Sequence, residues 1–493
     1  MWGTSILPLA LAAVPFANAI TLHKRDDPAV FRLPIARSEQ SQALQKRSSK
    51  VASTALYNVQ NLYYMVNITI GTPPQNLSLS LDTGSSDIWV NVPNSTYCAA
   101  DDDPCSSTGL FNPKNSSTFK LLGYDMNATY VSKNLAAGPY ATDTLVIGGV
   151  TVKNMEFAVA EQSDNPHGIL GIGYAISTDA ATNLHKEYAN LPEALVNSGA
   201  IKSAAYSLWL NKFDGTGNLL FGGVNKARYQ GELQTVPVLP LYGKYYSLAI
   251  ALTDISVKST HGTKSYATGL PLAVSLDNGT PFILLPKELV DPIYKEVGAG
   301  YSSTAQAAYI PCNMATADYN MTFSFSGATV TVPISELVFA DETEHGFPDG
   351  DCIFGLSPSQ AGVNLMGDVF LRGAYVVYDL ANNEISLANT NYDGGDDDIL
   401  EIGTGSAAVP NATLMPSPVT SATGNGASEA TATSGSPGPV SVETTTHVTG
   451  TATTTAKSGG ASSTSSKGLA ALPTSNPNHL LPGLLGAGLL LAL

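Results

Sequence analysis

The stretch from Leu77 to Val90 reads LSLSLDTGSSDIWV, and the rest of the chain is organised around it. Its leucines alternate with serines up to Asp82, which is the period of a half-buried β-strand. The strand then enters an Asp-Thr-Gly-Ser turn. There Gly84 permits a close backbone approach, and the hydroxyls of Thr83 and Ser85 can reach the carboxylate or a facing loop. Taken alone, the stretch is also compatible with an ordinary Asp-Gly turn of a hairpin.

A second copy of the pattern favours a functional interpretation. Residues 274–280 read VSLDNGT, which repeats the apolar strand, the Asp, the glycine and the hydroxyl. Gly171, in an Ile-Leu-Gly triplet, follows Asp82 by 89 residues. Gly367, in a Leu-Met-Gly triplet, follows Asp277 by 90 residues. A repeat of this length predicts two similar lobes, each presenting one Asp loop, so that two carboxylates lie side by side.

Four motifs follow one another along the chain. They are Asp82–Val90 (DTGSSDIWV), His167–Gly173 (HGILGIG), Leu276–Thr280 (LDNGT) and Leu365–Arg372 (LMGDVFLR). In this order they resemble the pepsin-like aspartic protease family, in the layout of its fungal, surface-anchored yapsin group. The resemblance runs from about Leu56 to Asn391. It implies a mainly β, bilobal fold with an active-site cleft between two pseudo-symmetric, β-rich lobes, expected at residues 48–240 and 241–394.

The resemblance also implies a chemistry, with Asp82 and Asp277 as the catalytic residues of an aspartic endopeptidase working at acidic pH. Two neighbouring carboxyls cannot both ionise cheaply, so the pair would share one proton over an acidic range. One would take a proton from a water, which attacks the peptide carbonyl that the other protonates or polarises. No metal, cofactor or covalent intermediate is required. Supporting residues would be Thr83, Gly84, Ser85, Gly279 and Thr280, and the substrate-covering flap tyrosine of the family matches Tyr130.

Two positions depart from the family pattern. Asn278 stands where the family has Thr or Ser, whose hydroxyl helps to clamp the two Asp loops together. Val131-Ser132-Lys133 follows the flap tyrosine in place of glycine and small or acidic residues. These departures keep a second hypothesis open, a protease-like fold that is weakly active or inactive and serves as a binding or cell-wall protein. Tyr130 can also be a routine strand aromatic, and Trp89 either donates its indole N–H to Tyr130 or fills the core.

Composition limits the other function classes. The 493 residues carry a net charge of −16, only 13% of them are charged, and the isoelectric point is near 4.7. Without a basic stripe to neutralise phosphates, nucleic-acid binding is not expected. The chain contains neither a Gly-x-Ser-x-Gly elbow nor a His-Glu-x-x-His metal motif. The expected partners are therefore protein or peptide substrates, and the protein is expected to be a monomer.

The chain has four cysteines, Cys98, Cys105, Cys312 and Cys352, which allow three disulfide pairings. Zinc binding is the alternative, but no histidine lies at ligand spacing near the first two cysteines. In a secreted chain, disulfides are the favoured interpretation. Local pairing, Cys98 with Cys105 and Cys312 with Cys352, is the simplest scheme and is the one that the resemblance implies.

The beginning of the chain reads as a secretory leader. Residues 1–19 have an apolar core and a small-x-small cleavage site at Ala17-Asn18-Ala19, and the apolar run is too short to span a membrane. Residues 20–47 read as a propeptide ending at the basic pair Lys46-Arg47, although such a pair can also be ordinary solvated charge. Cleavage after this pair would give a mature start at Ser48.

The end of the chain changes in composition. Residues 395–478 are dominated by Ser, Thr, Ala, Gly and Pro, which predicts a disordered, O-glycosylated stalk. Residues 479–493 form a hydrophobic tail that is shorter than the roughly 20 residues needed to span a bilayer. This arrangement fits a GPI-attachment signal, and a frayed hydrophobic end is the alternative. The expected location is the cell surface, reached by the secretory route, with a GPI lipid anchor to the plasma membrane or cell wall.

Asn-x-Ser/Thr sequons fit the same secretory route. The expected glycosylation sites are Asn67, Asn76, Asn94, Asn115, Asn127, Asn320 and Asn411. The sequon at Asn278 is expected to stay unused, because a glycan there would occupy the cleft.

Overall fold

The computed structural model describes residues 30–37, 63–100, 104–130, 134–213, 217–340, 346–360 and 362–425. The predicted signal peptide, the Lys46-Arg47 cleavage point, residues 131–133 of the flap, and the predicted stalk and tail beyond residue 425 lie outside these residues. Of the predicted propeptide, only residues 30–37 are described. Within the described ranges, no helix has both the length and the apolar character needed to cross a membrane.

The elements are mostly β-strands, which confirms the predicted fold class. The strands of the first half are β1 (Phe31–Arg37), β2 (Tyr64–Ile70), β3 (Gln75–Asp82), β4 (Ile88–Asn91), β5 (Lys120–Thr129), β6 (Leu135–Ile147), β7 (Val150–Ala160), β8 (Gln162–Ser163), β9 (Ile169–Gly171), β10 (Ala205–Trp209), β11 (Gly217–Phe221), β12 (Gly223–Asn225) and β13 (Tyr229–Pro237). Those of the second half are β14 (Ala249–Leu252), β15 (Asp254–Ser259), β16 (Gly262–Tyr266), β17 (Leu272–Leu276), β18 (Ile283–Leu285), β19 (Gly300–Ser302), β20 (Ala307–Pro311), β21 (Asn320–Phe325), β22 (Ala328–Pro333), β23 (Val338–Phe339), β24 (Asp351–Phe354), β25 (Leu356–Pro358), β26 (Leu365–Met366), β27 (Ala374–Asp379), β28 (Glu384–Thr390), β29 (Ile399–Glu401) and β30 (Ala412–Leu414). The described α-helices are α1 (Asp179–Asn183), α2 (Leu191–Asn197), α3 (Lys287–Val297) and α4 (Asp368–Leu371).

The first lobe is arranged around β3, the strand that leads to Asp82. The leucines of β3 are buried, as the Leu-Ser alternation predicts. β3 pairs antiparallel with β2 on one edge and parallel with β9 on the other, where Asp82 lies opposite Gly171. β9 pairs antiparallel with β4, and β4 pairs parallel with β7. The hairpin of β5 and β6 adds the outer edge of this sheet.

The second lobe repeats this arrangement around β17, the strand that leads to Asp277. β17 pairs antiparallel with β14 on one edge and parallel with β26 on the other. β26 pairs antiparallel with β18, and β18 pairs parallel with β25. The four strand relations have the same sense as in the first lobe. The sequence repeat therefore corresponds to two copies of one β-unit, each ending in an Asp loop.

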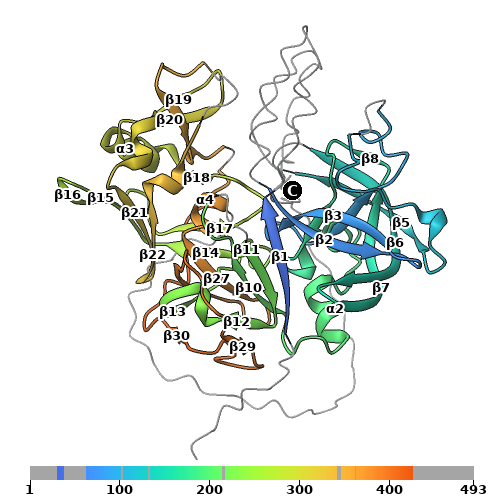
Figure 1. Cartoon of the computed structure of the whole chain (residues 1–493). Helices are drawn as coiled ribbons and strands as arrows, with labels where there is room; N and C mark the ends of the chain where they lie inside the picture. The colour runs from blue at the N-terminus through green and yellow to red at the C-terminus, as the bar shows by residue number, and fades with distance from the viewer. Residues whose placement is uncertain are drawn as a thin grey trace, which may run out of the picture.

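A shared sheet joins the two halves (Figure 1). In this sheet β13, β28, β27, β10 and β11 lie side by side, so β27 and β28, which follow the second lobe, lie between strands that precede it. β1 pairs with β11 through residues 31–35 and with β2 through residues 36–37. It thereby connects the shared sheet to the first lobe. The predicted lobe boundary at residues 240 and 241 falls between β13 and β14.

The largest difference from the sequence-based expectation concerns residues 391–425, which we call the strap. A disordered stalk is predicted from residue 395, yet this segment belongs to the folded body as far as residue 425. β29 pairs antiparallel with β12, and β30 pairs parallel with β13. Ile402, Val409 and Ala422 are buried. Composition does not reveal such a segment, because its stability comes from backbone pairing and a few small buried side chains rather than from a large apolar face.

Buried apolar side chains hold the whole body together. One continuous cluster contains Leu79 of the first lobe, Tyr206 of the shared sheet and Leu276 of the second lobe. Cys98 is joined to Cys105 and Cys312 to Cys352, which is the local pairing that the resemblance implies. The lobes are therefore packed on each other through the shared sheet, and the ends of β3 and β17 are fixed relative to each other.

Candidate active site

The two Asp loops meet where the central strands of the lobes end. Asp82 is the last residue of β3, and Asp277 directly follows β17. Both side chains are buried, with 1% and 0% of their surface exposed. A Cβ atom at Gly84 would lie 2.5 Å from Asp277 Oδ1, so only glycine allows the first loop to come this close to the second carboxyl. The Asp277 carboxyl thus lies against the first loop, and each of the two carboxyls changes the pKa of the other.

Each carboxyl is held by its own loop in the same way. The backbone N–H of Gly84 donates to Asp82 Oδ1 at 2.8 Å, and the Ser85 hydroxyl donates to Oδ2 at 2.5 Å. In the second loop, Gly279 N–H donates to Asp277 Oδ1 at 2.8 Å, and the Thr280 hydroxyl donates to Oδ2 at 2.9 Å. Of the predicted supporting residues, four donate a hydrogen bond directly to a carboxyl: Gly84, Ser85, Gly279 and Thr280. Thr83, the fifth, does not.

A reciprocal clamp between Thr83 and Asn278 locks the two loops together. The Thr83 hydroxyl donates to the carbonyl of Leu276 at 3.1 Å and accepts from Asn278 N–H at 3.0 Å. The side-chain amide of Asn278 forms two further hydrogen bonds with the first loop. Its Nδ2 donates to the Leu81 carbonyl at 3.1 Å, and its Oδ1 accepts from Thr83 N–H at 2.9 Å. An amide thus does with two atoms what a hydroxyl does with one, so the departure from the family pattern preserves the clamp.

Burial and proximity change the acidity of the pair. Burial raises the pKa of Asp82 well above its ordinary value, and the neighbouring Asp277 charge raises it further. The pKa of Asp277 is also raised by burial, but the hydrogen bonds from Thr280, Gly279 and Asp82 oppose that rise. Two carboxyls this close to each other cannot both ionise cheaply.

The predicted flap tyrosine, Tyr130, is linked through Trp89 to the segment that follows the first Asp loop. Tyr130 directly follows β5, and its N–H donates to the Asn134 carbonyl at 3.0 Å, which closes the hairpin of β5 and β6. The indole N–H of Trp89 donates to the Tyr130 hydroxyl at 2.6 Å. Both rings are buried. The hydrogen-bonding alternative for Trp89 is therefore the one adopted, and it ties the flap to the first Asp loop.

A third buried carboxyl, that of Asp87, supports the first loop from behind. It accepts from the Tyr140 hydroxyl of β6 at 2.8 Å and from the Tyr188 hydroxyl at 2.5 Å. Its second oxygen accepts from the N–H of Asp179, the first residue of α1, at 2.7 Å. Burial raises the pKa of Asp87 to about 6 despite these three donors. Asp87 therefore connects the flap strand and α1 to the loop that holds Asp82.

Sequence reasoning did not find this network. Asp87 is visible in the DTGSSD motif, but nothing in the sequence marks it as buried. Its phenol partners lie 53 and 101 residues away in the chain, outside any motif. Only the fold brings them together, so no local pattern could have identified them.

The predicted glycosylation sites are distributed over the surface. Six of the asparagines are exposed and one, Asn320, is half-buried; the exposed ones are Asn67, Asn76, Asn94, Asn115, Asn127 and Asn411. The sequon asparagine Asn278 is buried within the clamp. A residue with both amide atoms bonded inside the body has no room for a glycan.

Comparison with known proteins agrees with this geometry. The family model described as eukaryotic aspartyl protease matches residues 63–390. A probable aspartic-type endopeptidase opsB of Aspergillus oryzae is 43% identical over 500 residues, which cover 99% of each chain. Aspartic proteinase yapsin-3 of Saccharomyces cerevisiae is 35% identical over 392 residues, covering 76% of this chain and 74% of the relative. Barrierpepsin of the same yeast is 31% identical over 373 residues, covering 69% and 62%.

Replacing the clamp amide tests its contribution to stability. Asn278→Ala leaves Leu81 C=O and Thr83 N–H buried without their partners, so we expect the free energy of unfolding to fall by roughly 2–4 kcal/mol. Asn278→Thr restores one polar atom, so its free energy of unfolding should fall by less than that of Asn278→Ala. Urea unfolding measures both, with the exposed Asn313→Ala as control, expected to change stability by less than about 0.5 kcal/mol. An equal loss in the clamp and control variants would refute the clamp.

The raised pKa of Asp87 predicts a pH-dependent stability. Between its unfolded pKa near 4 and its folded pKa of about 6, the folded state binds the proton that the unfolded state has released. Wild-type stability should therefore fall as pH rises from 4 to 6, whereas Asp87→Asn lacks this contribution. The gap in unfolding free energy between wild type and variant should shift in favour of the variant over that range. A gap that stays constant over this range would contradict the prediction.

Proposed function

Because the chain belongs to the eukaryotic aspartyl protease family, we propose that it is an acid endopeptidase in which Asp82 and Asp277 jointly activate a water molecule. The observation that carries this proposal is the pair of neighbouring buried carboxyls, each held by its own loop, with the first loop lying directly against the Asp277 carboxyl. A pair that retains one proton supplies a base and an acid at once. The base takes a proton from the water, and the acid gives its proton to the scissile carbonyl.

The surroundings support this division of labour. The Thr83–Asn278 clamp holds the two Asp loops in place, so little reorganisation is needed when charge moves. Tyr130 closes the hairpin of β5 and β6, and its bond from Trp89 fixes the ring. The substrate would lie extended between flap and pair and form backbone hydrogen bonds.

The hypothesis of an inactive binding or cell-wall protein loses one of its two supports. Asn278 forms all the bonds that the clamp requires of it. The other departure, at residues 131–133, lies outside the described residues. Activity measured at acidic pH distinguishes the two hypotheses.

We propose that residues 20–47 form a propeptide. β1 lies within it and occupies a place in the shared sheet, between β11 and β2. Arg32 of this strand pairs with Asp397 of the strap at 2.5 Å. Removal of the propeptide would therefore vacate a strand position. N-terminal sequencing of active secreted protein should give Ser48, and a start at Ile20 would refute the proposal.

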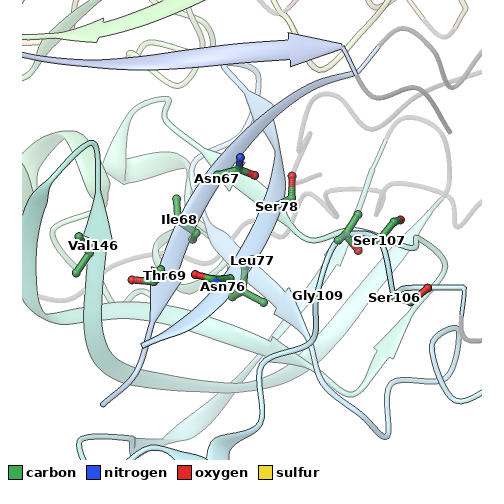
Figure 2. Close-up of a pocket in the computed structure, with 11 residues that line it drawn as sticks. Asn67, Ile68, Thr69, Asn76, Leu77, Ser78, Ser106, Ser107, Gly109 and Val146 are labelled. Carbon is green, nitrogen blue, oxygen red and sulfur yellow. The ribbon is translucent and has the colours of Figure 1, made fainter. Parts of the chain in front are cut away.

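We propose N-glycosylation at the seven predicted asparagines. Asn67 and Asn76 lie on the neighbouring strands β2 and β3, beside a groove of about 530 Å³ that is also lined by residues 106–109 (Figure 2). Both are exposed. Peptide mass spectrometry after deglycosylation should find these sites modified and Asn278 unmodified. A modified Asn278 would contradict the buried clamp.

We propose that the protein acts at the cell surface, held there by a GPI anchor added near the end of the predicted stalk. The relatives named yapsin-3 and barrierpepsin support a secreted or surface location. The short apolar tail supports the anchor. Phosphatidylinositol-specific phospholipase should release the protein from intact cells, and complete retention after treatment would argue against the anchor.

Replacing one catalytic carboxyl tests the central proposal. Asp82→Asn removes the shared proton and should lower kcat by about 10³-fold or more while the protein remains folded. The assay is cleavage of an acid-denatured protein at several pH values, with and without a statine-type inhibitor. Exposed Asp318→Asn is the matched control and should cleave normally. Uninhibited cleavage, or normal turnover by Asp82→Asn, would overturn the mechanism. A wild-type protein that does not cleave would favour the binding-protein hypothesis.

A further inference from the structure

The end of the strap lies against the strand that carries Asp277. After β30, the N–H of Val419 donates to the Ser326 hydroxyl at 2.8 Å. Ala422 is buried in an apolar cluster with Ala249 of β14 and Ala273 of β17. Thr423 then forms a bridge with Leu272 at the start of β17. The chain thus runs from the shared sheet to the second lobe before its last described residue, Asn425.

One edge of β17 forms a regular ladder that ends at Asp277. Alternate N–H groups of this edge donate to carbonyls of two different segments: Ala273 to Thr423 at 2.7 Å, Ser275 to Asn364 at 3.1 Å, and Asp277 to Met366 at 3.1 Å. Thr423 belongs to the strap, Asn364 directly precedes β26, and Met366 lies in β26. The strap therefore accepts one of these three hydrogen bonds from β17.

Asn425 binds the residue that provides the second of these bonds. Its side-chain Oδ1 accepts from Asn364 N–H at 2.8 Å, and its Nδ2 donates to the Asn364 carbonyl at 2.9 Å. The Asn364 carbonyl thus receives both Asn425 Nδ2 and Ser275 N–H. One amide side chain imitates the pairing of a neighbouring strand and fixes the start of β26.

The close fit of the strap requires a particular residue beside Asn425. Gly424 has φ +83°, and a Cβ atom there would lie 2.7 Å from Asn364 Nδ2 and 3.0 Å from Leu272 Cδ1. Any larger side chain at this position would push the strap end away from β17 and from Asn364.

The two lobes differ in how their central strands are held. β3 is paired along one edge with six residues of β2, whereas β17 is paired with four residues of β14. The strap adds contacts at the upstream end of β17, where the ladder with β26 has not yet begun. On the corresponding edge of β3, the Ser78 N–H donates to the Thr108 carbonyl at 2.8 Å, so the strap supplies to the second Asp loop a constraint that residue 108 supplies to the first.

From these contacts we propose that residues 423–425 position the second Asp loop and that Asn425 is a positioning residue for catalysis. The inference rests on the proposed function, because it takes Asp277 as one of the two catalytic carboxyls. Asn425 touches neither carboxyl and acts through Asn364, β26 and β17. Catalytic groups lose rate steeply when their supports allow displacements of an ångström or less.

Variants of the full-length protein test this role. Asn425→Ala removes both bonds to Asn364, and Gly424→Val displaces the same segment without removing the amide. We expect both to lower kcat by about tenfold with KM changed less than about twofold, because the loop geometry changes and the substrate contacts do not. The acid limb of the kcat–pH profile should also shift, since it reports the carboxyl pair. Thr420→Ala, an exposed change on the same segment, is the matched control and should leave both quantities unchanged.

The outcomes separate this inference from the proposed function. Reduced kcat and a shifted pH profile in both variants, measured well below their melting temperatures, support the positioning role. Wild-type kcat and pH profile in a folded Asn425→Ala protein overturn it, even if the melting temperature falls, because the role would then be structural only. A wild-type protein without cleavage overturns the proposed function itself, and this inference with it.

Discussion

The reciprocal hydrogen bonds between Thr83 and Asn278 are the constraint on which the rest of the site depends. Two carboxyls repel each other when both ionise, so something other than their own attraction must bring them together. The clamp does this through backbone groups at the root of each loop, and it leaves the carboxyl oxygens free for their own donors. The lobes then need only be rigid enough to deliver the two roots to one place, which the shared sheet accomplishes.

Acid is a favourable medium for this molecule on several counts. Asp82, Asp277 and Asp87 are all buried carboxyls with raised pKa values, and each of them binds a proton more readily in the folded state. Folding is therefore favoured as pH falls toward their unfolded pKa values. A net charge of −16 at neutral pH diminishes over the same range, which reduces self-repulsion. The expected stability and the proposed chemistry of a proton-sharing pair thus point to the same acidic conditions.

What could be predicted from the sequence was whatever the chain repeats or marks locally. The two Asp loops and the alternating leucines of β3 follow from motif and period. The Asp87 network could not be predicted, since Tyr140 and Tyr188 become its partners only through folding. Asn278 was recognised as unusual, but whether an amide could replace a hydroxyl depended on distances that no sequence states.

The strap shows that the family model and the folded unit end at different places. The match to the family model stops at residue 390, whereas backbone pairing continues to Thr423 and side-chain hydrogen bonds continue to Asn425. A fragment cut at residue 390 would uncover the outer edge of β13, the edge of β12 and the first N–H of the β17 ladder. Open strand edges invite pairing with other chains. The strap offers only the three-residue edge strands β29 and β30 in their place, so we expect it to reduce aggregation as well.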